Sequence, residues 1–208
     1  MYRVKTPWWL PKLFPSNLIW KMPETQPPAV YLTFDDGPHP TATPYVLEQL
    51  RLFNAKATFF CIGKNVVEQP EIFQRIQAEG HAVGNHTMNH LNGWKTDTTA
   101  YINNIAAAHQ YIGSHLFRPP YGRIKRAQAY MLGASVQPFK IIMWDVLSAD
   151  FDMAITPAQC LEHVLKNIRP GSIVVFHDSV KAWYRMSYAL PKVLAFCKEQ
   201  GWACEAIS

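Results

Sequence analysis

Two neighbouring aspartates, Asp35 and Asp36, directly follow an apolar segment at residues 29–34. Two carboxylates at the end of a buried strand repel each other and are partly desolvated. A divalent cation resolves this conflict, because one aspartate can bind it while the other stays free to act as a base on water. Asp-Asp-Gly is also typical of a simple turn with helix-capping carboxylates, so the pair alone leaves both interpretations open.

His86 and His90 form a second group of residues that could do chemistry, and they are four residues apart. Two histidines at this spacing on a helical turn point the same way and can share one metal ion. The pair alone is equally consistent with structural histidines. A catalytic zinc needs three protein ligands and one open position, and Asp36 is the obvious third ligand.

The elements that must position these residues follow from the hydrophobic patterning. Segments rich in β-branched and aromatic residues are predicted to be strands at residues 29–34, 56–62, 81–85, 115–118, 140–145, 172–176 and 202–207. Helical periodicity separates most of them, at residues 70–80, 98–112 and 187–200 and after the start signal Thr156-Pro157. Strands alternating with helices predict an α/β fold with a parallel sheet, and seven such units in 208 residues favour a small or incomplete, seven-stranded (β/α) barrel more than an open sheet.

The polar clusters all fall just after predicted strands. The carboxyl ends of parallel strands converge on one face of a barrel, where catalytic loops are assembled. Five clusters at that face therefore predict an active site. They are Asp35-Asp36-Gly37, the pair His86 and His90, the segment Arg118-Pro119-Pro120-Tyr121-Gly122, the pair Asp145 and Asp150, and His177-Asp178.

The sequences TFDDGP (33–38), HTMNH (86–90) and RPPYG (118–122) together resemble the first three motifs of the NodB-type polysaccharide deacetylases, the family-four carbohydrate esterases. Residues 144–151 and 173–178 match the last two motifs in order, and the resemblance covers residues 28–207. It implies a deformed (β/α) barrel, the TIM-barrel-like NodB-homology domain. It also implies a metal-dependent hydrolase that removes N-acetyl groups from glycans containing N-acetylglucosamine, of the peptidoglycan or chito-oligosaccharide type, and releases acetate.

The same resemblance implies roles for individual residues. Asp35 would be the general base, held ionised by Arg118, and His177 would be the general acid, tuned by Asp150. The backbone amide of Tyr121 would help to hold the oxyanion. The metal ligands would be Asp36, His86 and His90, with zinc as the expected metal and cobalt or nickel as alternatives.

The chain departs from the family pattern at two positions. Phe151 follows Asp150 where the family usually has tryptophan, and Val175 replaces a leucine two residues before the last-motif histidine. Both side chains are expected to line the slot for the acetyl methyl group, and plain core packing is the alternative. Tyr121 and Trp94 are further expected substrate contacts, since Trp94 lies in a loop on the catalytic side and could stack on a sugar or pack under the loop.

Two other functions remain open from the sequence. A non-haem iron enzyme could use the same Asp-His-His set, but the remaining catalytic candidates have no natural role in it. A catalytically silent glycan-binding barrel is the second alternative, and the presence of every proposed acid, base and ligand speaks against it. A nucleic-acid partner is not expected, because the net charge of +5 comes from dispersed Lys and Arg without interleaved aromatics.

Residues 1–27 are predicted to form an aromatic and basic arm that packs on a catalytic domain at residues 28–208. Pro7, Pro11 and Pro15 exclude one continuous amphipathic helix, and peripheral membrane contact by the arm is an alternative. The arm lacks the apolar stretch of a signal peptide, so a cytoplasmic location is expected, with envelope association as the alternative. No apolar run approaches the ~20 residues of a membrane span. The four cysteines lack paired spacing and are expected to be reduced, and the sequence makes no prediction of oligomeric state.

Overall fold

The computed structural model describes residues 2–15 and 17–208. Its central strand is β2 (Ala29–Asp35), all seven residues of which are buried. A strand that is covered on both faces must be apolar along its length, which explains its almost continuous hydrophobic run. Its parallel neighbours are β3 (Thr58–Cys61) on one side and β8 (Ile173–His177) on the other.

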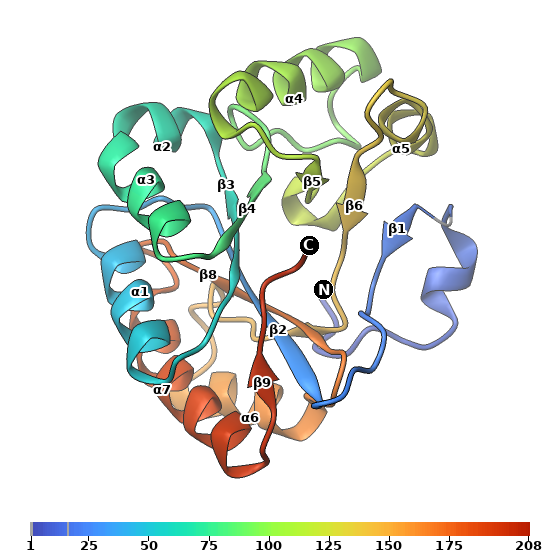
Figure 1. Cartoon of the computed structure of the whole chain (residues 1–208). Coiled ribbons are helices and arrows are strands. Elements are labelled where there is room, and N and C mark those ends of the chain that lie inside the picture. The colour runs from blue at the N-terminus through green and yellow to red at the C-terminus, as the bar shows by residue number, and fades with distance from the viewer. Residues whose placement is uncertain (1, 16) are drawn as a thin grey trace.

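The sheet extends outward from β2 in the order β1-β6-β5-β4-β3-β2-β8-β7, and each of these pairs is parallel. The further strands are β1 (Leu18–Ile19), β4 (Ala82–Asn85), β5 (Leu116–Phe117), β6 (Lys140–Ile142), β7 (Val146–Leu147) and β9 (Ala203–Cys204), which pairs with β2. Figure 1 shows the sheet curled, with helices around its outside. Within the described residues no strand pairing joins β1 to β7, so the barrel is incomplete.

The predicted α/β fold with a deformed barrel is confirmed, but the strand number of seven is wrong. Every predicted strand is present, and β1 and β7 are additional, which gives nine strands in the described part of the chain. β1 has only two residues and lies in no predicted segment, and β7 is a two-residue continuation of the apolar stretch predicted as a single strand at 140–145.

Helices cover the outer face of the sheet. They are α1 (Ala42–Leu52), α2 (Gly63–Glu68), α3 (Pro70–Ala78), α4 (Thr98–Ile112), α5 (Arg126–Gly133), α6 (Pro157–Asn167) and α7 (Trp183–Glu199), with short 3-10 turns η1 (Leu10–Leu13) and η2 (Pro120–Gly122). α4 has the predicted bounds. Asp97 caps its first turn by accepting backbone N–H groups, and Gly113 ends it in the left-handed conformation at φ 65°.

α7 begins four residues earlier than the sequence predicts, at Trp183 instead of residue 187, and it contains Pro191. A proline inside a helix lacks the N–H that would bond to the carbonyl four residues earlier. That carbonyl belongs to Ser187, and the Tyr45 hydroxyl of α1 donates to it at 2.8 Å. A side chain from another helix thus replaces the missing hydrogen bond, and α7 continues through the proline.

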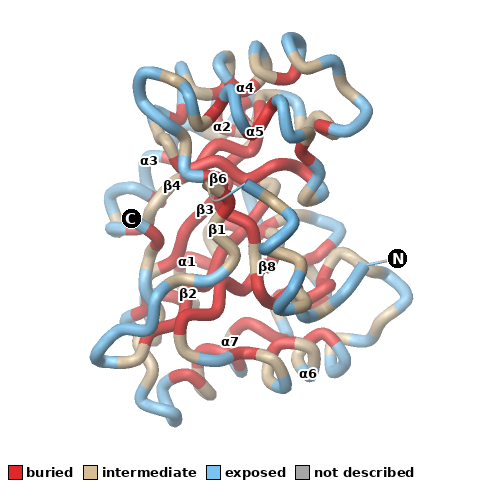
Figure 2. The backbone as a smooth tube through the Cα atoms, turned by 90° about the vertical axis from the view of Figure 1, so that its right-hand side faces the viewer, coloured by how far each residue is buried: buried red, intermediate tan, exposed pale blue. Residues whose placement is uncertain are grey.

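Buried residues concentrate on the strands and on the inner faces of the helices (Figure 2). In the main core, Phe34 of β2 lies between Phe59 and Phe176, with ring centroids 5.1 and 6.0 Å away. All four cysteines are free thiols, as the absence of paired spacing predicts. None of the helices in the described part of the chain has the length and apolarity that crossing a membrane requires.

The N-terminal segment contacts both edges of the open sheet. Lys5 forms an antiparallel bridge with Val146 of β7, and the N–H of Leu147 donates to the Val4 carbonyl at 2.7 Å. The Lys5 ammonium group also pairs with Asp145 at 2.5 Å. β1, which follows in the same segment, pairs with β6 at the other edge. Asp145 therefore anchors this segment and does not join the other polar strand-end residues.

Candidate active site

Asp35 ends β2 and is nearly buried, with Arg118 as its cationic partner. Nη1 of Arg118 donates to Oδ1 of Asp35 at 2.8 Å and to the Thr33 hydroxyl at 2.6 Å. Thr33 and Asp35 are two residues apart on β2 and therefore face the same side of the sheet. The ion pair predicted between Asp35 and Arg118 is thus present and shielded from solvent.

Arg118 is fully buried, so its remaining donors need partners inside the protein. Its Nε donates to the carbonyl of Ile142 and its Nη2 to that of Met143, both at 3.0 Å, and its guanidinium lies 4.1 Å from the centroid of the Phe60 ring. Burial lowers the pKa of Arg118, and Asp35 opposes that shift. Five donors in a rigid fork make this position specific for arginine.

Asp36, His86 and His90 each turn a ligand atom toward the same point. Nε2 of His90 lies 3.2 Å from Oδ1 of Asp36, Nε2 of His86 lies 3.7 Å from it, and one ligand atom from each residue lies within 4.8 Å of the others. Donor atoms on a tetrahedral zinc ion are about 3.3 Å apart, given bonds of about 2.0–2.2 Å. The spacing therefore fits one divalent transition metal.

The hydrogen bonding of these three residues supports the same fit. Oδ1 of Asp36 is buried and has no hydrogen-bond partner in the described part of the chain. The neighbouring histidines outweigh the opposing effect of burial and hold the pKa of Asp36 below its usual range. An ionised oxygen without a donor, beside two imidazoles, is a set that late first-row divalent metals favour.

His86 is held in the tautomer that a metal ligand needs. Its Nδ1 lies 2.8 Å from the carbonyl oxygen of Arg118, which can only accept, so Nδ1 carries the proton. The Nε2 lone pair is then directed toward Asp36. Burial lowers the pKa of His86 to about 4, against the opposing charge of Asp35, so the ring is neutral at pH 7. This arrangement is the usual outer support of a metal-binding histidine.

The predicted helical turn between His86 and His90 is wrong. The segment is an irregular loop after β4, with positive φ angles of 66° at Thr87 and 56° at His90. Asn104 of α4 holds this loop, because its side-chain oxygen accepts the N–H groups of Met88 and Asn89 at 2.9 and 3.1 Å. The two imidazoles nevertheless meet, with ring centroids 5.1 Å apart.

His177, which is partly exposed, and Asp150, which is fully buried, form a second pair at the same end of the sheet. Oδ1 of Asp150 lies 2.7 Å from Nδ1 of His177, and Oδ2 accepts the His177 backbone N–H at 2.7 Å. Burial by itself lowers the pKa of His177, but the charge and hydrogen bond of Asp150 outweigh it and raise that pKa to about 10. His177 is therefore protonated at neutral pH, and the strand register places it beside Asp35.

The four predicted substrate contacts differ in how close they lie to the candidate catalytic residues. Tyr121 is 62% exposed and its ring centroid lies 4.6 Å from that of His90. Phe151 packs edge-on against His177 at 5.3 Å. Val175 is buried two residues before His177 on β8, on the same face of the strand. Trp94 is exposed further along the loop after β4, where its indole N–H donates to the Ile124 carbonyl at 3.1 Å and Arg123 lies over its ring.

Asp178 is a residue that the sequence analysis left without a role. It is fully buried, and its carboxylate accepts the Gly37 N–H at 3.0 Å and the Thr43 hydroxyl at 2.5 Å. A Cβ on Gly37 would lie 2.0 Å from this carboxylate, which explains the glycine after the two aspartates. Asp178 thus fixes the turn that carries Asp35 and Asp36. In the sequence, the only sign of this role is that Asp178 directly follows His177, the candidate acid.

Arg185 of α7 holds the backbone of Asp150 in place. Its side chain is buried, and its Nε donates to the Asp150 backbone carbonyl at 2.6 Å while its Nη2 donates to the Lys181 backbone carbonyl at 2.8 Å. In the sequence it lies two residues before the predicted helix at 187–200, with nothing to distinguish it from surface residues.

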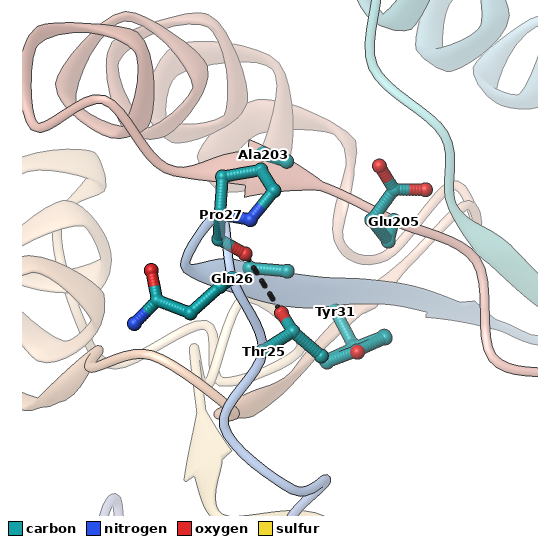
Figure 3. Close-up of a pocket in the computed structure, with 7 residues that line it drawn as sticks. Thr25, Gln26, Pro27, Tyr31, Ala203 and Glu205 are labelled. Atoms are coloured by element: carbon teal, nitrogen blue, oxygen red, sulfur yellow. Dashed lines mark hydrogen bonds between the residues drawn. The ribbon is translucent and has the colours of Figure 1, made fainter.

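A cavity of about 230 Å³ lies away from these residues (Figure 3). Its lining consists of Thr25, Gln26, Pro27, Ala29, Tyr31, Ala203 and Glu205. Ala29 begins β2 and Asp35 ends it, so the cavity and the site lie about 20 Å apart along the strand, at ~3.3 Å per residue. The polar strand-end residues, and not this cavity, are the candidate active site.

Fold and site together define the class of protein. A parallel, incomplete (β/α) barrel whose strand ends hold a candidate Asp-His-His metal site, an ion-paired aspartate and a histidine–aspartate pair is equipped as a hydrolase. Residues 23–134 match the family model described as polysaccharide deacetylase, and the chain belongs to this family. The family predicted from the sequence motifs is therefore confirmed.

Known relatives agree with this assignment over almost the whole chain. The chain is 34% identical over 204 residues to a peptidoglycan-N-acetylglucosamine deacetylase of Bacillus cereus, which covers 95% of this chain and 94% of the relative. It is 36% identical to a chitooligosaccharide deacetylase of Azorhizobium caulinodans, over 72% of this chain and 73% of that one. The crystal structure of the Bc1960 peptidoglycan N-acetylglucosamine deacetylase superposes with a TM-score of 0.86 at 31% identity, covering 97% and 95% of the two chains.

Proposed function

We propose that this chain hydrolyses N-acetyl groups of N-acetylglucosamine residues in glycans of the peptidoglycan or chito-oligosaccharide type. The observation that carries the proposal is the meeting of three groups at one end of the sheet: the Asp-His-His set, the Asp35–Arg118 pair and the His177–Asp150 pair. Deacetylation of an amide needs an activated water, a base and an acid for the departing amine. The relatives named above act on glycans of these two types.

The candidate ligands of the metal are Asp36, His86 and His90, with zinc as the proposed metal and cobalt or nickel as alternatives. A metal bound there would supply Lewis-acid activation of water and of the acetyl carbonyl. The protein contributes a neutral, oriented His86 and an ionised Asp36 whose free oxygen faces both imidazoles.

Protons would move through Asp35 and His177. Asp35, paired with Arg118, takes a proton from water as the water oxygen bonds to the acetyl carbon. His177, charged beside Asp150, gives its proton to the nitrogen as the carbon–nitrogen bond breaks. The products are acetate and a free amino sugar.

The walls of the site would orient the acetyl group. Tyr121 has a positive φ of 60°, and its backbone N–H is the proposed donor to the oxyanion. Phe151 and Val175 would enclose the methyl group, and Trp94 would stack on a neighbouring sugar. Phe151 touches the proposed acid directly, which supports a place in the acyl slot.

The experiment that tests this function is acetate release by the purified chain from a panel of glycans. The panel holds N-acetylated peptidoglycan fragments and chito-oligosaccharides, with O-acetylated xylan as the matched ester control. We expect acetate from at least one N-acetylated glycan, with an equal amount of free amine. Tight binding without acetate would favour a silent glycan-binding barrel, and oxygen-dependent turnover with bound iron would favour the oxygenase alternative.

A further inference from the structure

The charges of this chain are divided very unevenly. Residues 1–23 and 98–144 contain nine Lys and Arg and no Asp or Glu, which is a net charge of +9. The other residues contain 11 Lys and Arg against 15 Asp and Glu, which is a net charge of −4. The formal value of +5 therefore conceals a strongly basic part and an acidic part.

The two basic segments lie side by side in the fold. β1 pairs with β6, the Asn17 side chain donates to the Ala129 carbonyl of α5 at 3.0 Å, and Arg126 donates to the Leu13 carbonyl at 3.4 Å. Figure 1 shows the blue N-terminal segment on the right, next to the gold helix α5 and strand β6. The basic charge thus belongs to one side of the molecule.

Most of this charge is not neutralised within the protein. Lys5, Lys21 and Arg118 pair with acidic residues from other segments. The other six cations are in none of the ion pairs formed by the residues that the structure describes. These six are Arg3, Lys12, Arg123, Lys125, Arg126 and Lys140.

Large apolar side chains are exposed on the same side. On η1 and the residues before it, Trp8 is 77% exposed and Leu13 is 58% exposed, and Lys12 lies 4.7 Å over the Trp8 ring. On α5, Tyr130 is 75% exposed, and a shallow cavity lined by Pro15 and Tyr130 connects the two elements. We call this the arm–α5 surface, and its residues are Trp8, Trp9, Lys12, Leu13, Arg126, Tyr130 and Met131.

We infer that the arm–α5 surface docks on an anionic lipid bilayer. Tryptophan and tyrosine favour the boundary between lipid headgroups and acyl chains, and lysine and arginine beside them are attracted to anionic headgroups. A soluble anionic polymer would account for the charge, but it offers no apolar phase for Trp8, Leu13 and Met131. This inference does not depend on the proposed catalytic function.

Vesicle sedimentation with the full chain tests this inference. The probes are phosphatidylcholine vesicles with and without phosphatidylglycerol, at low and raised salt. The test variant combines Trp8→Ser with Lys12→Glu, and Arg126→Glu is a second variant on α5. The matched control combines Tyr188→Ser with Lys192→Glu, because Lys192 lies 3.7 Å over the Tyr188 ring on α7, in the acidic part of the chain.

We expect the chain to bind vesicles that contain phosphatidylglycerol, and salt to weaken that binding by screening. The double variant should lose about tenfold or more of the partition coefficient, while the control binds like the original chain. Circular dichroism melting confirms that each variant is folded, and Arg126→Glu provides the test if the double variant is not. No binding to anionic vesicles, or equal binding by both double variants, would overturn the inference. Binding only to a soluble polyanion such as heparin would also overturn it.

Discussion

At the residue scale, the two adjacent aspartates differ in their neighbours and not in their chemistry. Asp35 turns into the sheet interior and meets Arg118, which occupies one of its oxygens. Asp36, at a positive φ of 79°, turns the other way toward His86 and His90. This reversal of direction between consecutive residues would let one carboxylate act as a base while the other binds a metal.

Replacing Asp35 by asparagine tests the role of the base. Asparagine keeps the shape and can still accept from Arg118, but it cannot take a proton. We expect deacetylation to fall by roughly 100- to 10,000-fold, with metal content unchanged, because the three candidate ligands are untouched. Acetate release and metal analysis of the purified variant measure both quantities.

Asp145→Asn is the matched control, because Asp145 is also buried and paired with a cation, Lys5. It should keep its activity even if it loses some stability. Full activity in Asp35→Asn, or equal losses in both variants, would show that Asp35 is not the base.

Asp150 should set the pH range of the reaction. His177, whose pKa is raised to about 10, stays protonated through neutral pH and loses its proton as the pH rises through that value. Asp150→Asn removes the charge that raises this pKa. The alkaline fall in kcat should therefore move to lower pH by at least about one unit, since Asp150 opposes the effect of burial most strongly and only the charges of Asp36 and Asp35 would still oppose it. An alkaline limb that stays in place would assign the proton donor to another group.

At the scale of elements, strand ends made the active site predictable. Each polar cluster follows an apolar β segment, and parallel strands bring their carboxyl ends to one edge. That local pattern was enough to group Asp35, Asp36, His86, Arg118 and His177. The helical period of the apolar residues likewise placed α4 correctly, because the residues that recur on one face, Tyr101, Ile105, Ala108 and Ile112, are the ones that are buried.

Features that depend on distant residues could not be predicted in the same way. The loop from His86 to His90 takes its shape from Asn104 of α4, and α7 continues through Pro191 because of Tyr45. Asp178 and Arg185 act through backbone groups of other segments. None of these contacts leaves a periodic trace in the sequence.

The contact between Tyr45 and Ser187 predicts a cost in stability. Tyr45→Phe removes the donor and leaves the carbonyl opposite Pro191 without a partner. We expect the free energy of unfolding to fall by about 1 kcal/mol or somewhat more, as for other partly buried hydrogen bonds. Urea unfolding measures this change. Tyr130→Phe, on an exposed side chain, is the control, and equal effects in both variants would contradict this account of the helix.

At the scale of the whole molecule, the N-terminal segment contacts both edges of the open sheet. It contacts β7 through residues 4–6 and β6 through β1, and Tyr2 reaches Phe151 at 5.4 Å. Residues 1–23 of this segment include exposed aromatics and no acidic residue. Phe151 also packs on His177. Tyr2, Phe151 and His177 therefore form a chain of ring contacts from the N-terminal segment to the proposed acid.

The central claim is that Asp36, His86 and His90 hold a metal on which N-acetyl hydrolysis depends. The most direct measurement combines metal content with acetate release for the original chain and for His90→Ala, before and after chelation and metal return. We predict about one divalent metal ion per original chain, with activity that chelation removes and zinc restores, and loss of both properties in His90→Ala. Unchanged metal content and full acetate release in His90→Ala would contradict the claim.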